Sequence, residues 1–242
     1  MTNLPVFFYL SELKYRLIYF LVSFILIFIT AYFYSEVIFY LLANPLLNIS
    51  NSQSISFIST HVSEIFLSYL KLAGFIGIVC SFIVFLCHVY IFLAPGLYKH
   101  EKSYLFNVIL VSFFLFILSF FCTYYYLIPV IWKFFLSFQF ISSDLDLNLN
   151  PRIYEYINIT LNLLLLFSFS FQLPLILKIL LDFKLISLNF LVKKRHFFIL
   201  FSFILSGIIT PPDIYSQFIL AITSIFFFEF TIFFKLFSNS IK

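Results

Sequence analysis

Residues 103–132 read SYLFNVILVSFFLFILSFFCTYYYLIPVIW, an apolar run without a single charged side chain. This run is longer than the roughly 20 residues that an α-helix needs to cross about 30 Å of hydrocarbon. The whole chain has the same character, since 63% of its 242 residues are hydrophobic, 24% are aromatic and only 10% are charged. A water-soluble globule cannot cover so much apolar surface. The sequence therefore predicts an all-α, polytopic membrane protein.

Six segments between successive charges pass the same length test and are predicted to be transmembrane helices. They are 17–35, 72–98, 103–132, 156–177, 196–212 and 214–234. Segment 196–212 is the shortest, and at about 1.5 Å per residue it falls short of the membrane thickness, so we expect the bilayer to thin beside it. The connections 36–71 and 133–155 are long and are expected to cap the outer face. We expect residues 1–242 to form one six-span domain.

The distribution of basic residues predicts the orientation. If the N-terminus is inside, all but three of the 14 Lys and Arg residues fall in inner segments, as the positive-inside rule requires. The exceptions are Lys71, Lys133 and Arg152. Both termini are therefore expected on the inner side, which means cytoplasm, matrix or stroma. The net charge of +4 is too small to indicate nucleic acid binding.

The residues that usually carry chemistry form no recognisable catalytic or metal site. The three cysteines lie in apolar stretches without metal-ligand spacing, and the four histidines fall in four different segments. The sequence also lacks a Ser-His-Asp candidate, an HExxH motif and a Gly-rich phosphate loop. We therefore expect no enzyme activity, no metal and no cofactor.

Two acidic residues stand out near the predicted inner face. Glu12 and Arg16 are four residues apart just before the first span, which is the spacing of an intrahelical ion pair. An interfacial helix with a solvated charged face would show the same pattern. Glu101 follows Pro95 and lies among the lysines of the loop after the second span. The positive-inside rule accounts for the lysines of this loop but not for Glu101.

Three further polar residues lie in or beside the later spans. Gln172 shares a helix face with Asn158 at membrane depth, where polar side chains seldom face lipid. This face indicates either hydrogen bonding between helices or a functional polar site. Asp213 lies in the short connection between the last two spans, and a turn or helix N-cap residue is the favoured explanation for it. Glu229, near the inner end of the last span, is expected either to reach the interface or to pair.

Taken in order, short motifs along nearly the whole chain resemble the TatC family, the multi-span subunit of the twin-arginine (Sec-independent) protein translocase. They are LSELKYRL (10–17), ANPL (43–46), FLAPGLYKHE (92–101), FQLP (171–174), KRHF (194–197), TPPDIYSQ (210–217) and FE (228–229). Each motif alone is weak, but their order and the six-span topology strengthen the resemblance. Two departures affect the N-terminal motif, because Tyr9 stands where the family often has His, and Lys14 where it often has Arg.

The resemblance implies a receptor that binds twin-arginine signal peptides of folded cargo proteins at the inner face. Glu12, Phe92, Pro95 and Glu101 resemble its signal-peptide-binding surface. A planar guanidinium fork suits carboxylates better than an ammonium does.

The resemblance also implies sites beyond the signal-binding surface, and it implies partners. Gln172 resembles an intramembrane polar site, while Asp213 and Glu229 resemble a region that docks partners. The implied partners are single-span small translocase subunits, the lipid bilayer and further copies of this chain.

Other functions and several membranes remain open from the sequence. A secondary transporter would use Gln172 as a midplane site, but the two halves lack matching interrupted helices. A structural subunit of a respiratory complex would co-purify with that complex. Within the family, the Phe-rich composition is most similar to mitochondrion-encoded members, so we expect the mitochondrial inner membrane, with the plastid thylakoid and the bacterial inner membrane as alternatives.

Overall fold

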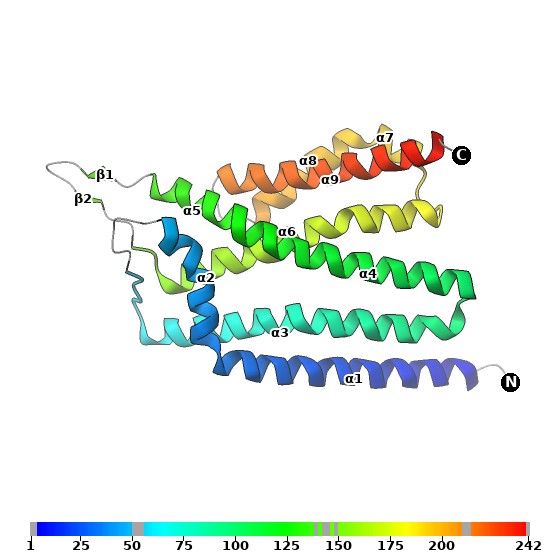
Figure 1. Cartoon of the computed structure of the whole chain (residues 1–242), viewed down its shortest axis with the longest axis horizontal. Helices are drawn as coiled ribbons and strands as arrows, with labels where there is room; N and C mark the ends of the chain where they lie inside the picture. Colours follow the sequence, from blue (N-terminus) through cyan, green and yellow to red (C-terminus); the bar gives the residue numbers. More distant parts are fainter. Residues whose placement is uncertain are drawn as a thin grey trace. The chain divides into compact units, whose positions relative to one another are not determined.

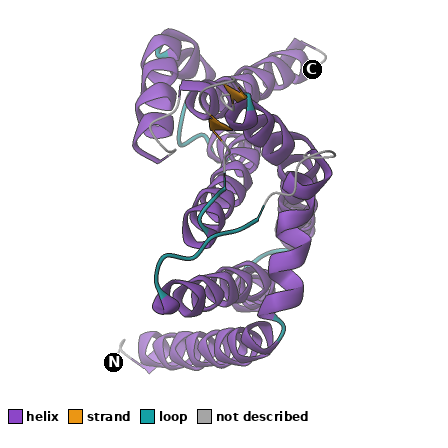
Figure 2. Cartoon of the chain, turned by 90° about the vertical axis from the view of Figure 1, so that its left-hand side faces the viewer, coloured by secondary structure: helices purple, strands orange, loops and turns teal. Residues whose placement is uncertain are grey.

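The structure is a computed structural model that describes residues 4–49, 56–137, 140–141, 146–147, 150–209 and 214–240. Helices dominate this part of the chain, as Figures 1 and 2 show. The helices are α1 (Leu4–Phe33), α2 (Ser35–Ile49), α3 (Val62–Leu93), α4 (Lys99–Cys122), α5 (Ile128–Leu136), α6 (Ile153–Asp182), α7 (Leu188–Lys193), α8 (Arg195–Ile209) and α9 (Ile214–Ser240). The all-α prediction is confirmed.

Four short elements complete the described chain. A 3₁₀ turn, η1 (Ala94–Gly96), follows α3, and a π-helical segment, η2 (Thr123–Leu127), joins α4 to α5. Two-residue strands β1 (Phe140–Ile141) and β2 (Asp146–Leu147) pair antiparallel.

Five helical stretches of the described chain are long and apolar enough to cross a membrane. They are Leu10–Phe33, Val62–Gly96, Lys99–Leu136, Ile153–Asp182 and Ile214–Phe237. With α8, they correspond in order to the six predicted spans. Many of their large apolar side chains face outward, as Phe114 (68% exposed) and Phe169 (70% exposed) do. Such surfaces require lipid as their solvent.

Helix α8 is short, as the sequence predicted for segment 196–212. It has 15 residues, so at about 1.5 Å per residue it is only about 22 Å long. The expected outer connection 36–71 is partly helical instead, because α2 occupies Ser35–Ile49 and α3 begins at Val62. The α2 sequence SEVIFYLLANPLLNI is apolar enough to pack but too short to span.

Pro129 accounts for the π-helical segment between α4 and α5. A proline inside a helix has no N–H to donate, and its ring clashes with the carbonyl four residues earlier. In the turn before it, the backbone N–H of Ile128 donates to the carbonyl of Thr123, which is five residues earlier. This wider turn lets one continuous apolar stretch, Lys99–Leu136, pass the proline.

The chain divides into two compact units. Unit 1 contains Met1–Ala43 and Ser59–Phe113, and unit 2 contains Asn44–Ile58 and Phe114–Lys242. In unit 1, α1 and α3 lie side by side, as Figure 1 shows. Gly77 permits their close approach, because a Cβ there would lie 2.9 Å from Cε2 of Phe24. Further along the pair, the Phe20 and Phe85 rings meet edge to face at 5.6 Å.

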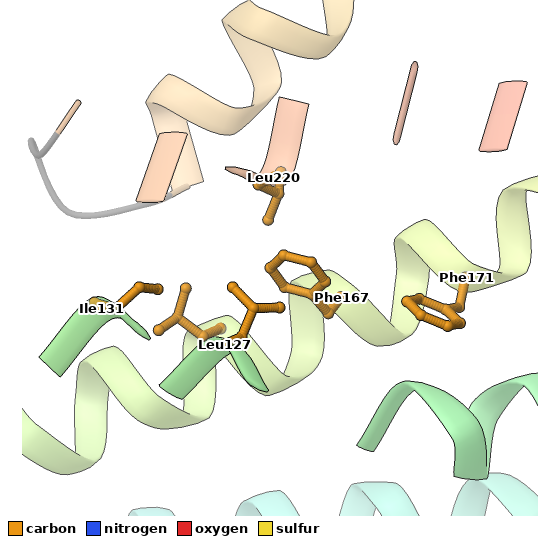
Figure 3. Packing of buried hydrophobic residues seen from close by; sticks show 6 residues of the cluster. Leu127, Ile131, Phe167, Phe171 and Leu220 are labelled. Atoms are coloured by element: carbon orange, nitrogen blue, oxygen red, sulfur yellow. The ribbon is translucent and has the colours of Figure 1, made fainter. Parts of the chain in front are cut away.

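Unit 2 is built around α6, whose buried residues include Tyr156, Ile157 and Leu163. Its first apolar cluster joins η2, α5, α6 and α9 and is drawn in Figure 3. The cluster members are Leu127, Ile131, Leu163, Phe167, Phe171 and Leu220. A second cluster lies where α6 ends and joins α6, α7 and α9. Its members are Leu177, Leu181, Leu191, Phe228 and Ile232.

Candidate functional site

The first candidate site lies on α1 and α3 in unit 1. Arg16 donates to the carboxylate of Glu12, as the four-residue spacing predicted. The same guanidinium reaches α3, where it donates to the backbone carbonyl of His88 at 3.4 Å and lies 5.8 Å from the centre of the Phe92 ring. Two of the predicted site residues, Glu12 and Phe92, are therefore joined through Arg16.

The other two predicted residues follow on the α3–α4 connection. Pro95 is exposed in η1, and Glu101 lies in the first turn of α4. The Glu101 carboxylate accepts a hydrogen bond from the backbone N–H of Tyr98 at 3.0 Å. It thereby satisfies an amide at the helix start, where negative charge is also favoured by the helix dipole. In Figure 1, this connection and the start of α1 lie at the same end of unit 1.

A small crevice opens between α1 and α3 beside this site. Its volume is about 150 Å³, and its wall is mostly apolar, with Arg16, His88 and Phe92 among the lining residues. Nε of Arg16 and Nδ1 of His88 are buried without a hydrogen-bond partner within the described chain. The crevice therefore offers an almost entirely apolar wall beside the Arg16–Glu12 ion pair.

Gln172 lies apart from this site, on α6 in unit 2. Only 9% of its surface is exposed, and it sits between Phe171 of the first apolar cluster and Pro174 inside the helix. A buried amide at this depth needs hydrogen-bond partners, and a helix proline frees backbone groups nearby. The prediction that this polar group avoids lipid agrees with its burial.

Glu229 pairs, which was one of its two predicted outcomes. Its carboxylate lies 3.1 Å from the guanidinium of Arg195, so the ion pair joins α9 to the start of α8. A second ion pair, between Lys235 and Asp182, joins α9 to the end of α6. Asp213 lies outside the described residues. Within the described chain, no three His, Cys, Asp or Glu side chains gather as a metal site.

A larger groove runs along α8 and α9, and sequence reasoning missed the residue that organises it. The groove has a volume of about 740 Å³ and is lined by residues such as His196, Phe203, Ile208 and Gln217. The Gln217 amide donates to the backbone carbonyl of Phe203 at 3.1 Å. A Cβ on Gly207 would lie 2.7 Å from that amide nitrogen, so only glycine leaves room for this bond. Gln217 closes the TPPDIYSQ motif, which was the available signal.

Comparisons with known proteins agree across almost the whole chain. Residues 8–222 match the family model described as Sec-independent protein translocase protein (TatC). The chain is 39% identical over 233 residues to the uncharacterized tatC-like protein ymf16 of Reclinomonas americana, covering 96% of this chain and 87% of that protein. It is 35% identical over 224 residues to the Sec-independent protein translocase protein TatC of Rickettsia prowazekii (strain Madrid E), covering 93% of this chain and 89% of that protein.

A solved structure shares the fold as well. The crystal structure of the twin-arginine translocase receptor TatC is 28% identical to this chain and superposes with a TM-score of 0.78. The superposition covers 93% of this chain and 96% of that one. Sequence and fold therefore agree over the same extent of chain.

Proposed function

Because the chain belongs to the TatC family of Sec-independent protein translocase proteins, we propose that Glu12, Phe92, Pro95 and Glu101 form the surface that receives twin-arginine signal peptides. The membership makes the chain a six-span receptor subunit of the twin-arginine translocase. It is a transport component and not an enzyme.

The observation that carries the proposal is the contact set of Arg16. One guanidinium already lies against the carboxylate of Glu12 and over the face of Phe92. An arginine of an incoming peptide needs the same two features, a carboxylate for its planar fork and an aromatic face for its cation. The chain thus holds, within its own α1–α3 pair, a binding geometry that suits a second guanidinium.

Charge pairing alone is too weak to hold a peptide. The Glu12 side chain is 29% exposed, and ion pairs at exposed sites contribute only about 0–1 kcal/mol. Burial of apolar surface must supply most of the affinity, at about 25 cal/mol for each Å² removed from water. The apolar wall of the α1–α3 crevice offers such surface, and Arg16, the ion-pair partner of Glu12, is among its lining residues. A signal peptide with an apolar stretch beside its arginines fits this combination.

The same geometry predicts discrimination against lysine. A guanidinium presents five donors in a rigid fork, whereas an ammonium is a compact and strongly hydrated point charge. Replacing both signal arginines with lysines therefore keeps the charge but loses the bidentate and stacked contacts. Selectivity between the two peptides is the most direct readout of the proposed site.

The test is photo-crosslinking of the full chain with a signal peptide. The purified protein in nanodiscs is incubated with a peptide that carries two arginines and a photoreactive group beside them. We expect adducts on the segments that contain Glu12 and Glu101, and fewer with the twin-lysine peptide. Glu12→Gln and Glu101→Gln should each reduce the yield, and the double variant should reduce it further.

Glu155→Gln is the matched control, because it removes one exposed carboxylate that belongs to unit 2 and lies 3.5 Å from Arg152. Its adduct yield should equal that of the wild type. Equal labelling by the twin-lysine peptide, or an equal loss in the Glu155→Gln variant, would refute the proposed recognition surface.

The groove of α8 and α9 is the proposed docking region for single-span partner subunits. Its apolar lining suits a lipid-embedded helix, and the Gln217 amide offers a polar contact within it. Glu229 supports this region by fixing α9 to α8 through Arg195. Asp213 immediately precedes α9 in the sequence and is proposed as part of the same docking region.

Disulfide crosslinking tests this docking region. Ile204→Cys, on the groove wall, should capture a co-purified single-span subunit that carries a cysteine. Phe169→Cys, on an exposed face of α6, should capture less. Equal capture by the two variants would reject the groove as the docking region.

Gln172 is proposed as a polar site at membrane depth, and further copies of this chain are proposed within the complex. The burial of Gln172 in α6 supports the first proposal. Gln172→Leu should leave signal-peptide crosslinking intact while lowering transport. Loss of crosslinking in this variant would instead indicate a purely structural role.

Orientation and location are proposed from the charges and the relatives. An inner position of both termini is supported by the basic residues, most of which then fall in inner segments. The similarity to the ymf16 protein and the Phe-rich composition support the mitochondrial inner membrane. Protease protection of tagged termini in mitochondria stripped of their outer membrane tests both points. Both tags should be protected, and cleavage of either tag would contradict the proposed orientation.

A further inference from the structure

The connection between α6 and α8 combines exposed lysines with exposed apolar side chains. We propose that this α6–α8 connector, residues 183–194, binds the headgroup of an anionic phospholipid at the membrane surface. The inference does not rest on signal-peptide recognition, because the connector belongs to unit 2 and the proposed receptor surface belongs to unit 1.

The lysines of the connector are available to bind an anion, because the nearby described acidic residues are paired with other cations. The acidic residues described at this end of unit 2 are Asp182 and Glu229, and each is already paired, with Lys235 and Arg195 respectively. Lys184, Lys193 and Lys194 are all exposed. Lys194 faces an aromatic ring, since its Nζ lies 4.6 Å from the centre of Phe197. The connector therefore carries an excess of positive charge that its described neighbours do not neutralise.

Large apolar side chains of the connector are exposed, as its lysines are. Phe183 is 64% exposed, Leu185 is 71% exposed and Phe190 is 53% exposed. Charges that serve only to set topology do not require large apolar side chains beside them. Lysines interleaved with Phe and Leu are typical of segments that lie in the headgroup region, with the rings in the acyl boundary and the ammonium groups among the phosphates.

The connector is a packed structure and not a loose loop. Leu191 is only 7% exposed and belongs to the second apolar cluster, together with Phe228 of α9. The Ser187 hydroxyl caps α7 by accepting a hydrogen bond from the backbone N–H of Phe190 at 3.2 Å. The two ion pairs to α9 hold its flanks. Its lysines are therefore presented from a fixed backbone, which reduces the entropy lost when a headgroup binds.

Charge complementarity selects the occupant. Clusters of Lys and Arg next to a transmembrane helix attract anionic lipids, and each such residue contributes roughly a fivefold gain in binding. An acidic protein segment would match the charge but not the exposed Phe and Leu side chains. Free phosphate would match the lysines alone. An anionic phospholipid supplies both a phosphate for the lysines and acyl chains for the apolar side chains.

The test is native mass spectrometry of the detergent-purified full chain. The protein is incubated with equal amounts of phosphatidylglycerol and phosphatidylcholine that carry identical acyl chains. We expect wild type to retain phosphatidylglycerol preferentially. Lys193→Gln/Lys194→Gln should lower this preference by roughly 10- to 30-fold, because two lysines are removed. Lys193→Arg/Lys194→Arg should keep it, which also shows that substitution at these positions is compatible with folding.

Three comparisons separate the alternatives. Lys71→Gln/Lys133→Gln removes the same charge elsewhere and should leave the preference unchanged. An equal loss of lipid preference in that variant would show that only the net charge of the chain matters, and would overturn the proposal. Displacement of the lipid by a tenfold excess of glycerol phosphate would indicate a free-phosphate site instead. If Lys193→Gln/Lys194→Gln leaves the lipid preference unchanged while the wild type binds an acidic peptide, the connector would instead bind a protein partner.

Discussion

Gly207 and Gln217 are predicted to be strongly coupled, because the hydrogen bond between α8 and α9 exists only where residue 207 has no Cβ. In Gly207→Ala, the new Cβ would lie 2.7 Å from the Gln217 amide nitrogen and would force that side chain away from the Phe203 carbonyl. Interhelical hydrogen bonds in membranes contribute about 0.6 kcal/mol on average and up to about 1.7 kcal/mol. The clash itself should destabilise the protein by about 1–3 kcal/mol more, while the higher helix propensity of alanine should stabilise it by up to about 1 kcal/mol.

The double-mutant cycle separates these terms. Gly207→Ala should destabilise the protein, and Gln217→Ala should do so by no more than the lost hydrogen bond. In the Gln217→Ala background the clash is gone, so Gly207→Ala should become neutral or stabilising. The coupling free energy should therefore be at least about 1.5 kcal/mol.

The single tryptophan makes this cycle measurable in unit 2. Trp132 is 4% exposed and belongs to that unit, so its fluorescence reports unfolding in mixed micelles as the denaturing detergent is raised. Free energies come from the wild type, the two single variants and the double variant under the same conditions. Additive free energies, with a coupling below about 0.5 kcal/mol, would show that residues 207 and 217 do not meet as described.

Two further substitutions test the other packing contacts. Gly77→Ala should destabilise the α1–α3 pair by about 1–3 kcal/mol, because its Cβ would lie 2.9 Å from the Phe24 ring. Gly74→Ala, whose Cβ would lie 3.8 Å from Phe28, should be neutral or slightly stabilising. Circular dichroism in mixed micelles measures both variants, and equal effects would contradict the close approach at Gly77. Arg195→Glu and Glu229→Arg should each lower the thermal midpoint, and the swapped double variant should restore most of it. The effect should stay within about 1 kcal/mol because both side chains are about 40% exposed, and failure of the swap to restore stability would show that the pair is not the relevant contact.

The membrane fold was predictable because lipid imposes a simple rule on the backbone. With no water in the hydrocarbon, a spanning segment must satisfy its own N–H and C=O groups, so long uncharged stretches become helices. The short span 196–212 was recognised by its charge boundaries and became α8. Helix α2 was missed because a length test for spans does not register an apolar helix of 15 residues that ends before it could cross.

The candidate site was predictable only where it depends on local spacing. The Glu12–Arg16 pair follows from a four-residue separation on one helix. The contact of Arg16 with Phe92, and that of Glu229 with Arg195, join residues far apart in the chain, and they depend on which helix faces pack together. Gln217 was overlooked because a neutral amide has no charge to mark it, and its role depends on the missing side chain of Gly207.

The short helix α8 makes the protein sensitive to lipid chain length. At about 22 Å, it leaves roughly 8 Å of a standard bilayer unmatched, and each ångström of mismatch costs a fraction of a kcal/mol in elastic deformation. The lipids around α8 must therefore compress, and shorter acyl chains relieve that compression. Stability and transport should both rise as the host membrane is made from shorter-chain lipids, and the membrane in which this chain works best should be a thin one.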